Sequence, residues 1–145
     1  MFIKQISVFL ENAPGTLREL THMLGKSGID LMALSLADTQ NFGIVRVIVA
    51  DGNIDPALKM LREAGFMCRV NNVICAEVED RPLGLHDLLV TIHDMGVSVE
   101  YLYSFLRATG DKALIILRLS EQDETVDKLA AAGVKIVGQE EIDKL

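Results

Sequence analysis

The sequence contains one pattern twice, and this repeat constrains the fold more than any other feature. Pro14 and Pro82 stand 68 residues apart. The same shift relates further residues: Glu11 to Glu79, Leu17 to Leu85, Leu20 to Leu88, Gly28 to Gly96, Leu61 to Leu129 and Gly65 to Gly133. The segments 42–49 and 112–119 match at an offset of 70. Matched apolar positions along both halves predict two copies of one structural unit, with domains at 1–71 and 72–145.

Each half predicts the order strand, helix, strand, strand, helix, strand. In the first half the strands are expected over 3–10, 30–38, 42–50 and 67–71, with helices over 15–26 and between a capping Asp55 and Gly65. In the second half the strands are expected over 73–78, 98–106, 112–119 and 134–137, with helices over 83–95 and over 121–132, the latter capped by Ser120. The tail predicts one short helical turn. This order is typical of α+β, ferredoxin-like βαββαβ repeats, here as antiparallel sheets with helices on one face and joined side by side.

The strands carry apolar residues on both faces of the expected sheets. Residues such as Ile6, Val8 and Val47 alternate toward the helices. The opposite face is expected to carry Phe9, Met32, Leu34, Leu36, Ile44 and Ile48 in one half, and Val73, Cys75, Leu102, Leu114 and Ile116 in the other. Water does not favour such a surface, so something should cover it. A homodimer through these open sheet faces is the simplest expectation.

Composition and charge exclude several classes of function. The net charge of −7 and pI near 4.9 disfavour binding to nucleic acid or to anionic membranes. No apolar run reaches the roughly 18 residues of a membrane helix, and the first residues do not resemble a signal peptide. The two cysteines, Cys68 and Cys75, form no disulfide framework or CxxC motif. A cytoplasmic protein is therefore expected.

The loop "ENAPGTLREL" joins the first strand to the first helix and is the main candidate site. The first N–H groups of that helix, near Gly15, Thr16 and Leu17, have no intrahelical partner and attract a carboxylate or a phosphate. Gly15 would let a ligand approach the backbone closely. The alternative is that Asn12 or Thr16 caps the helix and that nothing binds there.

These residues resemble the opening of the ACT domain, a regulatory module of amino-acid metabolism. The resemblance is carried by Asn12, Pro14-Gly15, Leu17 and the helix exit Gly28-Ile29-Asp30-Leu31. The second half keeps the frame through Asp80, Pro82, Leu85 and Gly96-Val97-Ser98-Val99, but it has Leu83 after the proline and moves the glycine to Gly84. The chain is therefore similar to a stand-alone tandem ACT protein.

The resemblance implies where an amino acid binds. ACT domains commonly pair edge to edge, and the ligand lies between the first loop of one domain and the second strand of its neighbour. By position, the first loop would contribute Asn12, Ala13, Pro14, Gly15, Thr16 and Leu17, opposite Ser98, Val99 and Glu100. The second loop would contribute Arg81, Pro82, Leu83, Gly84 and Leu85, opposite Asp30, Leu31 and Met32.

The function that follows from the resemblance is an allosteric, amino-acid-binding regulatory protein without catalytic residues, cofactor or metal. The alternative is a dissociable regulatory subunit of an amino-acid biosynthetic enzyme. A small phosphatase shares the fold plan, but the first loop lacks the arginine and the glycine-rich phosphate loop that such an enzyme needs. The histidines, His22, His86 and His93, lack metal-ligand spacing, although His86 could line the second loop.

Overall fold

The computed structural model of the 145-residue chain describes residues 1–11, 13–38, 41–107 and 110–145. The chain forms two compact units, which are residues 4–71 and residues 72–145 together with 1–3. One strand, β4 (Met67–Glu79), contributes residues to both units. The strands expected over 67–71 and 73–78 are therefore one continuous strand.

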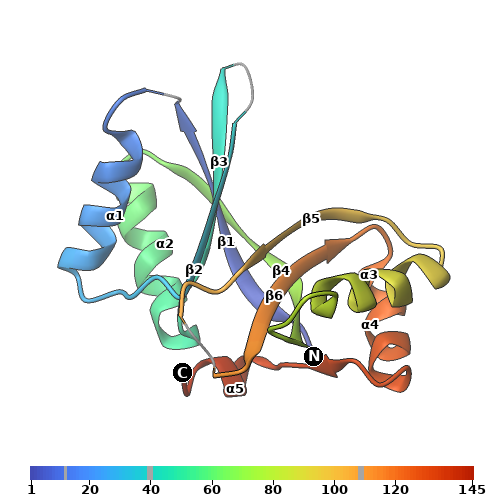
Figure 1. The fold of residues 1–145 in the computed structure, drawn as a ribbon. Coiled ribbons are helices and arrows are strands. Elements are labelled where there is room, and N and C mark those ends of the chain that lie inside the picture. Colours follow the sequence, from blue (N-terminus) through green and yellow to red (C-terminus); the bar gives the residue numbers. More distant parts are fainter. Residues whose placement is uncertain (12, 39–40, 108–109) are drawn as a thin grey trace. The chain divides into compact units, whose positions relative to one another are not determined.

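The unit of residues 4–71 is a four-stranded sheet with two helices. Its elements are β1 (Ile3–Glu11), α1 (Thr16–Lys26), β2 (Ala33–Asp38), β3 (Phe42–Ile48), a short 3₁₀ turn at Asp51–Asn53, α2 (Ile54–Glu63) and the first part of β4. The strand order is β2-β3-β1-β4, so β2 is an edge strand of this unit. The helices α1 and α2 lie side by side on one face of the sheet (Figure 1).

The unit of residues 72–145 repeats this plan. It continues with α3 (Gly84–Asp94), β5 (Val99–Ser104), β6 (Lys112–Leu119), α4 (Gln122–Ala131), β7 (Lys135–Ile136) and α5 (Gln139–Ile142). In this unit β4 lies between β6 and β7, and β5 pairs with the outer side of β6. The predicted α+β fold of two ferredoxin-like repeats with antiparallel strand pairing is confirmed.

Each unit has its own core between its helices and its sheet. In the first, Leu20 and Leu24 of α1 are fully buried against the apolar side chains of β1 and β3. In the second, Leu88 and Ile92 of α3 take the matching positions. Burying one such side chain stabilises a fold by about 1.5–3 kcal/mol. Leu20 and Leu88 therefore correspond in the sequence because they fill the same place in the two cores.

Two expected helix caps are wrong. Asp55 lies inside α2, which follows Asn53 and the 3₁₀ turn, so it does not precede the helix. Ser120 does not cap α4, because its Oγ accepts the N–H of Ser98 at 3.1 Å and the helix starts after Glu121. In both cases a short segment between strand and helix takes a conformation that propensity alone does not reveal.

The expected faces of the two edge strands are also wrong in part. Leu34 and Leu36 pair with Val47 and Val45, whose side chains belong to the first core, so both leucines face the helices. Leu102 pairs with Leu117 of the second core and also faces the helices. The strand β2 begins at Ala33, three residues later than expected. Because side chains alternate along a strand, an error in its register reverses their assignment to the two faces.

The C-terminal segment lies close to the sheet face of the second unit that is turned away from the helices. The N–H of Val137 donates to the carbonyl of Cys75 at 2.8 Å, and α5 follows directly. Burial, with smaller contributions from the charges of Glu141 and Glu77, raises the pKa of the Cys75 thiol to about 12. Ile142 is the buried residue of α5 and is fully inaccessible. The polar tail thus forms the expected short helix and anchors it through one isoleucine.

Substitution of Ile142 by aspartate is expected to expose Cys75. The charged side chain cannot stay buried without a partner, so α5 should detach at a cost of several kcal/mol. The measurement is the rate at which a thiol reagent labels Cys75 below pH 9, with the half-buried Cys68 as an internal reference. The exposed Glu140→Ala change on the same helix is the control and should leave the rate unchanged. Equal rates for Ile142→Asp and the original chain would contradict this account.

Candidate ligand site

The first loop leads into α1 through a residue in the left-handed conformation. Gly15 precedes the helix with φ 88° and ψ −9°. Thr16 is the first helical residue, and its hydroxyl donates to the carbonyl of Ala13 at 3.1 Å. Its side chain therefore points back into the loop and does not cap the helix. Asn12, the other expected cap, lies outside the described residues.

The start of α1 leaves backbone N–H groups without protein acceptors. The first bond of the helix runs from the N–H of Glu19 to the carbonyl of Gly15 at 2.9 Å. The N–H groups of Leu17 and Arg18 precede it, and within the described residues neither has an acceptor and no side chain caps the helix. Such groups carry partial positive charge and suit an anionic ligand group.

A hollow of about 400 Å³ lies beside this helix start. Its lining consists of Pro14, Gly15, Thr16, Arg18, Glu19 and His22. Arg18 adds a positive charge and Glu19 a negative charge, which suits a ligand that carries both signs. Leu17 packs partly against the first core, and its contact with a ligand stays a prediction.

The second loop adopts the same backbone with different residues. Leu83 takes the place of Gly15 in the repeat and has φ 68° and ψ −2°. The N–H of Gly84 donates to the carbonyl of Arg81 at 3.0 Å, and the first bond of α3 runs from Asp87 to Leu83. The N–H groups of Leu85 and His86 are thus the counterparts of those of Leu17 and Arg18.

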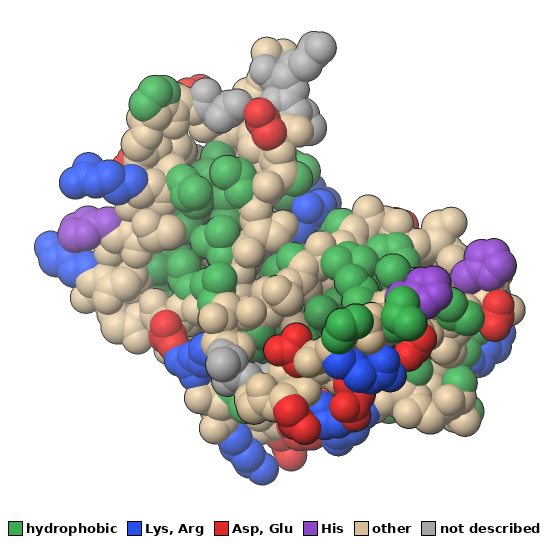
Figure 2. Space-filling view, in the orientation of Figure 1, with side chains coloured by type: hydrophobic (Ala, Val, Ile, Leu, Met, Phe, Trp, Pro, Cys, Tyr) green, Lys and Arg blue, Asp and Glu red, His purple; other side chains and the backbone are tan. Residues whose placement is uncertain are grey.

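The second loop has its glycine at position 84, one residue later than the first loop has Gly15 in the repeat, and the reason is steric. A Cβ atom at Gly84 would stand 2.0 Å from the carbonyl oxygen of Glu79, so only glycine fits there. Leu83 then occupies the left-handed position, which costs a leucine about 1–2 kcal/mol. Backbone strain of this kind is often found at functional sites. Leu83 is also 64% exposed, and Figure 2 shows hydrophobic side chains gathered over α3.

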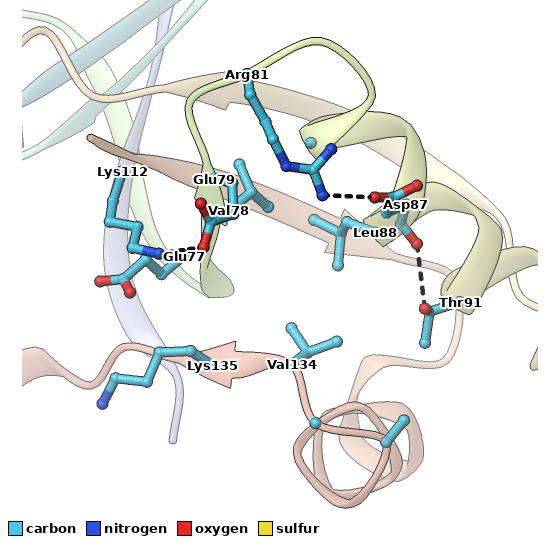
Figure 3. Close-up of a pocket in the computed structure, with 13 residues that line it drawn as sticks. Glu77, Val78, Glu79, Arg81, Asp87, Leu88, Thr91, Lys112, Val134 and Lys135 are labelled. Atoms are coloured by element: carbon cyan, nitrogen blue, oxygen red, sulfur yellow. Dashed lines mark hydrogen bonds and ion pairs between the residues drawn. The ribbon is translucent and has the colours of Figure 1, made fainter.

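A second cavity, of about 360 Å³, opens beside α3 on the side of β4 and β7 (Figure 3). The charged side chains that line it are Glu77, Glu79, Arg81, Asp87, Lys112 and Lys135. Arg81 donates to Asp87 at 3.0 Å, and Lys112 is paired with Glu79. In Figure 3 Arg81 and Asp87 lie at one rim, Val134 and Lys135 at the opposite rim, and Leu88 between them.

The two expected facing segments lie at the starts of edge strands, one in each unit. Met32 is 4% exposed, and its N–H donates to the carbonyl of Ile48. Ser98 exchanges hydrogen bonds with Ser120, and Glu100 pairs with Arg118 at 3.6 Å beside a bulge in β5. The side chain of Met32 and the N–H of Ser98 are therefore already engaged. Contact between a loop of one unit and the strand of another ACT unit stays a prediction.

Sequence reasoning found both loops but missed most of the charged cavity. Its residues come from β4, α3, β6 and the segment after α4, which are far apart in the sequence. A comparison of the two halves of the sequence could have identified these residues, because several of these positions are charged in the second half only. Among the described residues no cluster of His, Cys, Asp or Glu could hold a metal ion.

Comparisons with known proteins agree with this fold. The family model for the ACT domain pair matches residues 1–145. The crystal structure of protein BT0572 from Bacteroides thetaiotaomicron is 34% identical, with a TM-score of 0.88 over 100% of this chain and 98% of that one. The regulatory subunit of aspartate kinase from Thermus thermophilus, in its ligand-free form, is 16% identical, with a TM-score of 0.64 over 89% and 91% of the two chains. A search of curated proteins finds no match.

The chain therefore belongs to the ACT domain pair family. None of the described helices combines the length and the apolar character needed to cross a membrane.

Replacing Leu83 by glycine is expected to stabilise the protein. The change removes the left-handed strain, but it adds entropy to the unfolded chain, so the expected net gain is about 0.5–1 kcal/mol. Gly84→Ala should cost about 1–3 kcal/mol because the new Cβ meets the Glu79 carbonyl. Denaturant unfolding measures both, and Gly52→Ala, which meets open space, is the control. A destabilised Leu83→Gly protein would show that the leucine side chain has a packing role.

The ion pair in the cavity makes a pH-dependent contribution. The hydrogen bond and charge of Lys112 hold the pKa of the Glu79 carboxyl below its ordinary value. Because the pKa of Glu79 is lower in the folded protein than in the unfolded chain, the ion pair stabilises the fold at pH values above the ordinary pKa of a glutamate. This stabilisation is lost as the pH falls through the lowered pKa. Lys112→Met should return the Glu79 pKa toward its ordinary range in an NMR titration. Glu141, whose pKa is lowered by Lys135 and the N–H of Gly138, should not respond.

Proposed function

We propose that this ACT domain pair is a regulatory protein that binds a free amino acid, with the ligand carboxylate at the start of α1. The observation that carries the proposal is the pair of N–H groups at Leu17 and Arg18, which have no acceptor among the described residues and lie beside an open hollow. The family adds support, since the protein from Thermus thermophilus is the regulatory subunit of an aspartate kinase.

The proposed site recognises both ends of the amino acid. The helix start and Arg18 attract the carboxylate, whereas Glu19 and strand carbonyls of a neighbouring ACT unit accept from the ammonium. By position the facing segments are Ser98–Glu100 and Asp30–Met32, at the starts of β5 and β2. Metabolites at about 10 μM to 1 mM need binding free energies of only about −4 to −7 kcal/mol. A few charge-assisted hydrogen bonds, each contributing about 1.5–3 kcal/mol, supply this.

The proposed role is regulation and not catalysis. A ligand held between two ACT units changes their mutual rigidity or angle, and by linkage a partner that prefers one geometry responds to ligand concentration. Two arrangements are compatible with this role. The chain is either a free-standing sensor or a dissociable subunit that binds an amino-acid biosynthetic enzyme. Co-purification with such an enzyme distinguishes the two. A homodimer belongs to the same proposal, but only through the part of these faces that stays exposed, such as Phe42 with 57%. Six residues expected on these faces are already buried within the chain: Met32, Ile48, Val73, Cys75, Leu114 and Ile116.

The test is a thermal-shift screen with the common L-amino acids, followed by two variants of Gly15. Gly15→Asp and Gly15→Asn impose a similar backbone strain at φ 88°, but only aspartate adds a negative charge. The aspartate should repel the ligand carboxylate and remove most of the ligand-induced shift, and the asparagine variant should retain it. A shift that survives in Gly15→Asp would place the ligand elsewhere, and a screen without any stabilising amino acid would refute the proposed function.

A further inference from the structure

The outer face of α3 has exposed apolar side chains at its centre. Residues spaced by three, four and seven positions share one face of a helix. On this face α3 and the residue directly before it present six exposed side chains, those of Leu83, His86, Asp87, Val90, His93 and Asp94. Leu83 is 64% exposed and Val90 is 43% exposed. Both point away from the core of their unit, which α3 contacts through Leu88 and Ile92 on its opposite face.

The matching face of α1 in the first repeat has no large apolar side chain. The shift of 68 residues gives its members as Gly15, Arg18, Glu19, His22, Gly25 and Lys26. Four of these border the hollow of the proposed ligand site. In the second repeat Leu83 replaces Gly15 in the left-handed conformation, which favours glycine. A contact that covers Leu83 and Val90 would give a role to apolar side chains that the core of the unit does not use.

The polar groups that flank Val90 form two sides. Successive helical residues are about 100° apart around the axis. His86 and His93 therefore lie about 40–60° to one side of Val90, and Asp87 and Asp94 lie about 40–60° to the other. Figure 2 shows histidine side chains beside hydrophobic ones over α3. The outer face of α3 thus has a histidine side and an aspartate side, with apolar groups between them.

We infer that the outer face of α3 binds the same face of a second copy of this chain, with the two helices parallel. A two-fold axis parallel to the helices exchanges the two sides, so the histidine side of one copy meets the aspartate side of the other. His86 then lies next to Asp87 of the partner subunit, and His93 next to Asp94 of the partner subunit. The offset within each pair is one residue, or about 1.5 Å along the axis. Antiparallel helices would place histidine against histidine.

Contacts within the chain orient these groups and leave them able to bind a second copy. Asp87 accepts from Arg81 at 3.0 Å, and Nδ1 of His93 lies 3.3 Å from the carboxylate of Asp94. A carboxylate can accept from more than one donor, and an imidazole has two ring nitrogens. An apolar centre with a polar rim is the usual anatomy of a protein interface. One helix face is smaller than the standard interface of about 1,600 Å², so we expect association in the micromolar range.

The first experiment measures the molar mass of the full chain by sedimentation equilibrium, without added ligand, from about 1 μM to about 1 mM. Val90→Asp should weaken association about tenfold or more, because the contact would bury an unpaired charge. Lys26→Asp, on the matching face of α1, is the control and should leave association unchanged. Leu83→Gly should also weaken association, although it is expected to stabilise the monomer, and a purely structural leucine would not separate these two effects.

The second experiment tests the pairing of the two sides with complementary variants. One variant carries His86→Asp and His93→Asp, and the other carries Asp87→Lys and Asp94→Lys. Each variant alone should associate about tenfold or more weakly than the original chain, because like charges then meet across the contact. An equimolar mixture should associate again. These side chains are exposed, with 88% for His93 and 71% for Asp94, so the substitutions should leave the fold intact.

The outcomes separate this contact from the proposed function, which does not depend on it. A chain that stays monomeric throughout the range would overturn the contact, as would a mixture of the two variants that fails to associate. A loss of association in Phe42→Asp but not in Val90→Asp would overturn it and support the homodimer through the sheet face. Association that depends on Val90 would support the contact even if no amino acid stabilises the chain in the thermal-shift screen.

Discussion

An α-helix cannot satisfy its own first N–H groups, and in both units no side chain among the described residues caps the helix that follows the first strand. A left-handed residue stands directly before it, Gly15 in one unit and Leu83 in the other. This left-handed conformation turns the chain sharply just before the helix begins. A serine or an aspartate in a capping geometry would have bonded to those amides. The uncapped start is what makes each loop a candidate ligand site.

The two repeats agree where cores are built and differ where ligands could bind. Leu20 and Leu88 occupy the same buried position, because packing tolerates little change in volume. Around the loops the halves diverge in size and charge, as Met23 and Thr91 illustrate. Duplication of a domain provides a second frame with the same backbone, and divergence on that frame can create a different site. The internal repeat therefore serves as its own control for which residues the fold requires.

The parts of the fold that follow from periodicity could be predicted, and the parts set by tertiary context could not. The helices and the inner strands β1, β3, β4 and β6 carry long regular patterns, and their predicted ranges agree with the structure to within a few residues. The edge strands β2 and β5 are short and pair on one side only within their units, so their register, and hence the face of Leu34, was ambiguous.

The candidate site could likewise be predicted only in part. Pro14 and Pro82 predict both loops, because a proline and a glycine between a strand and a helix leave few backbone conformations other than a turn. The pairing of Lys112 with Glu79, and the charged lining around it, depend on strand register and on neighbours from four segments. No local pattern encodes such neighbours.

The charge of the chain helps to decide among the ligands that an uncapped helix could attract. A net charge of −7 repels dianions such as phosphate esters at long range, although salt screens this beyond about 10 Å. A zwitterion has no net charge and approaches without that penalty. In the proposed complex its carboxylate would meet the amides of Leu17 and Arg18 at short range, where screening is weak, and its ammonium would be attracted by Glu19. At the proposed site, the combination of a negative protein and a locally positive helix start would thus favour zwitterions over simple anions.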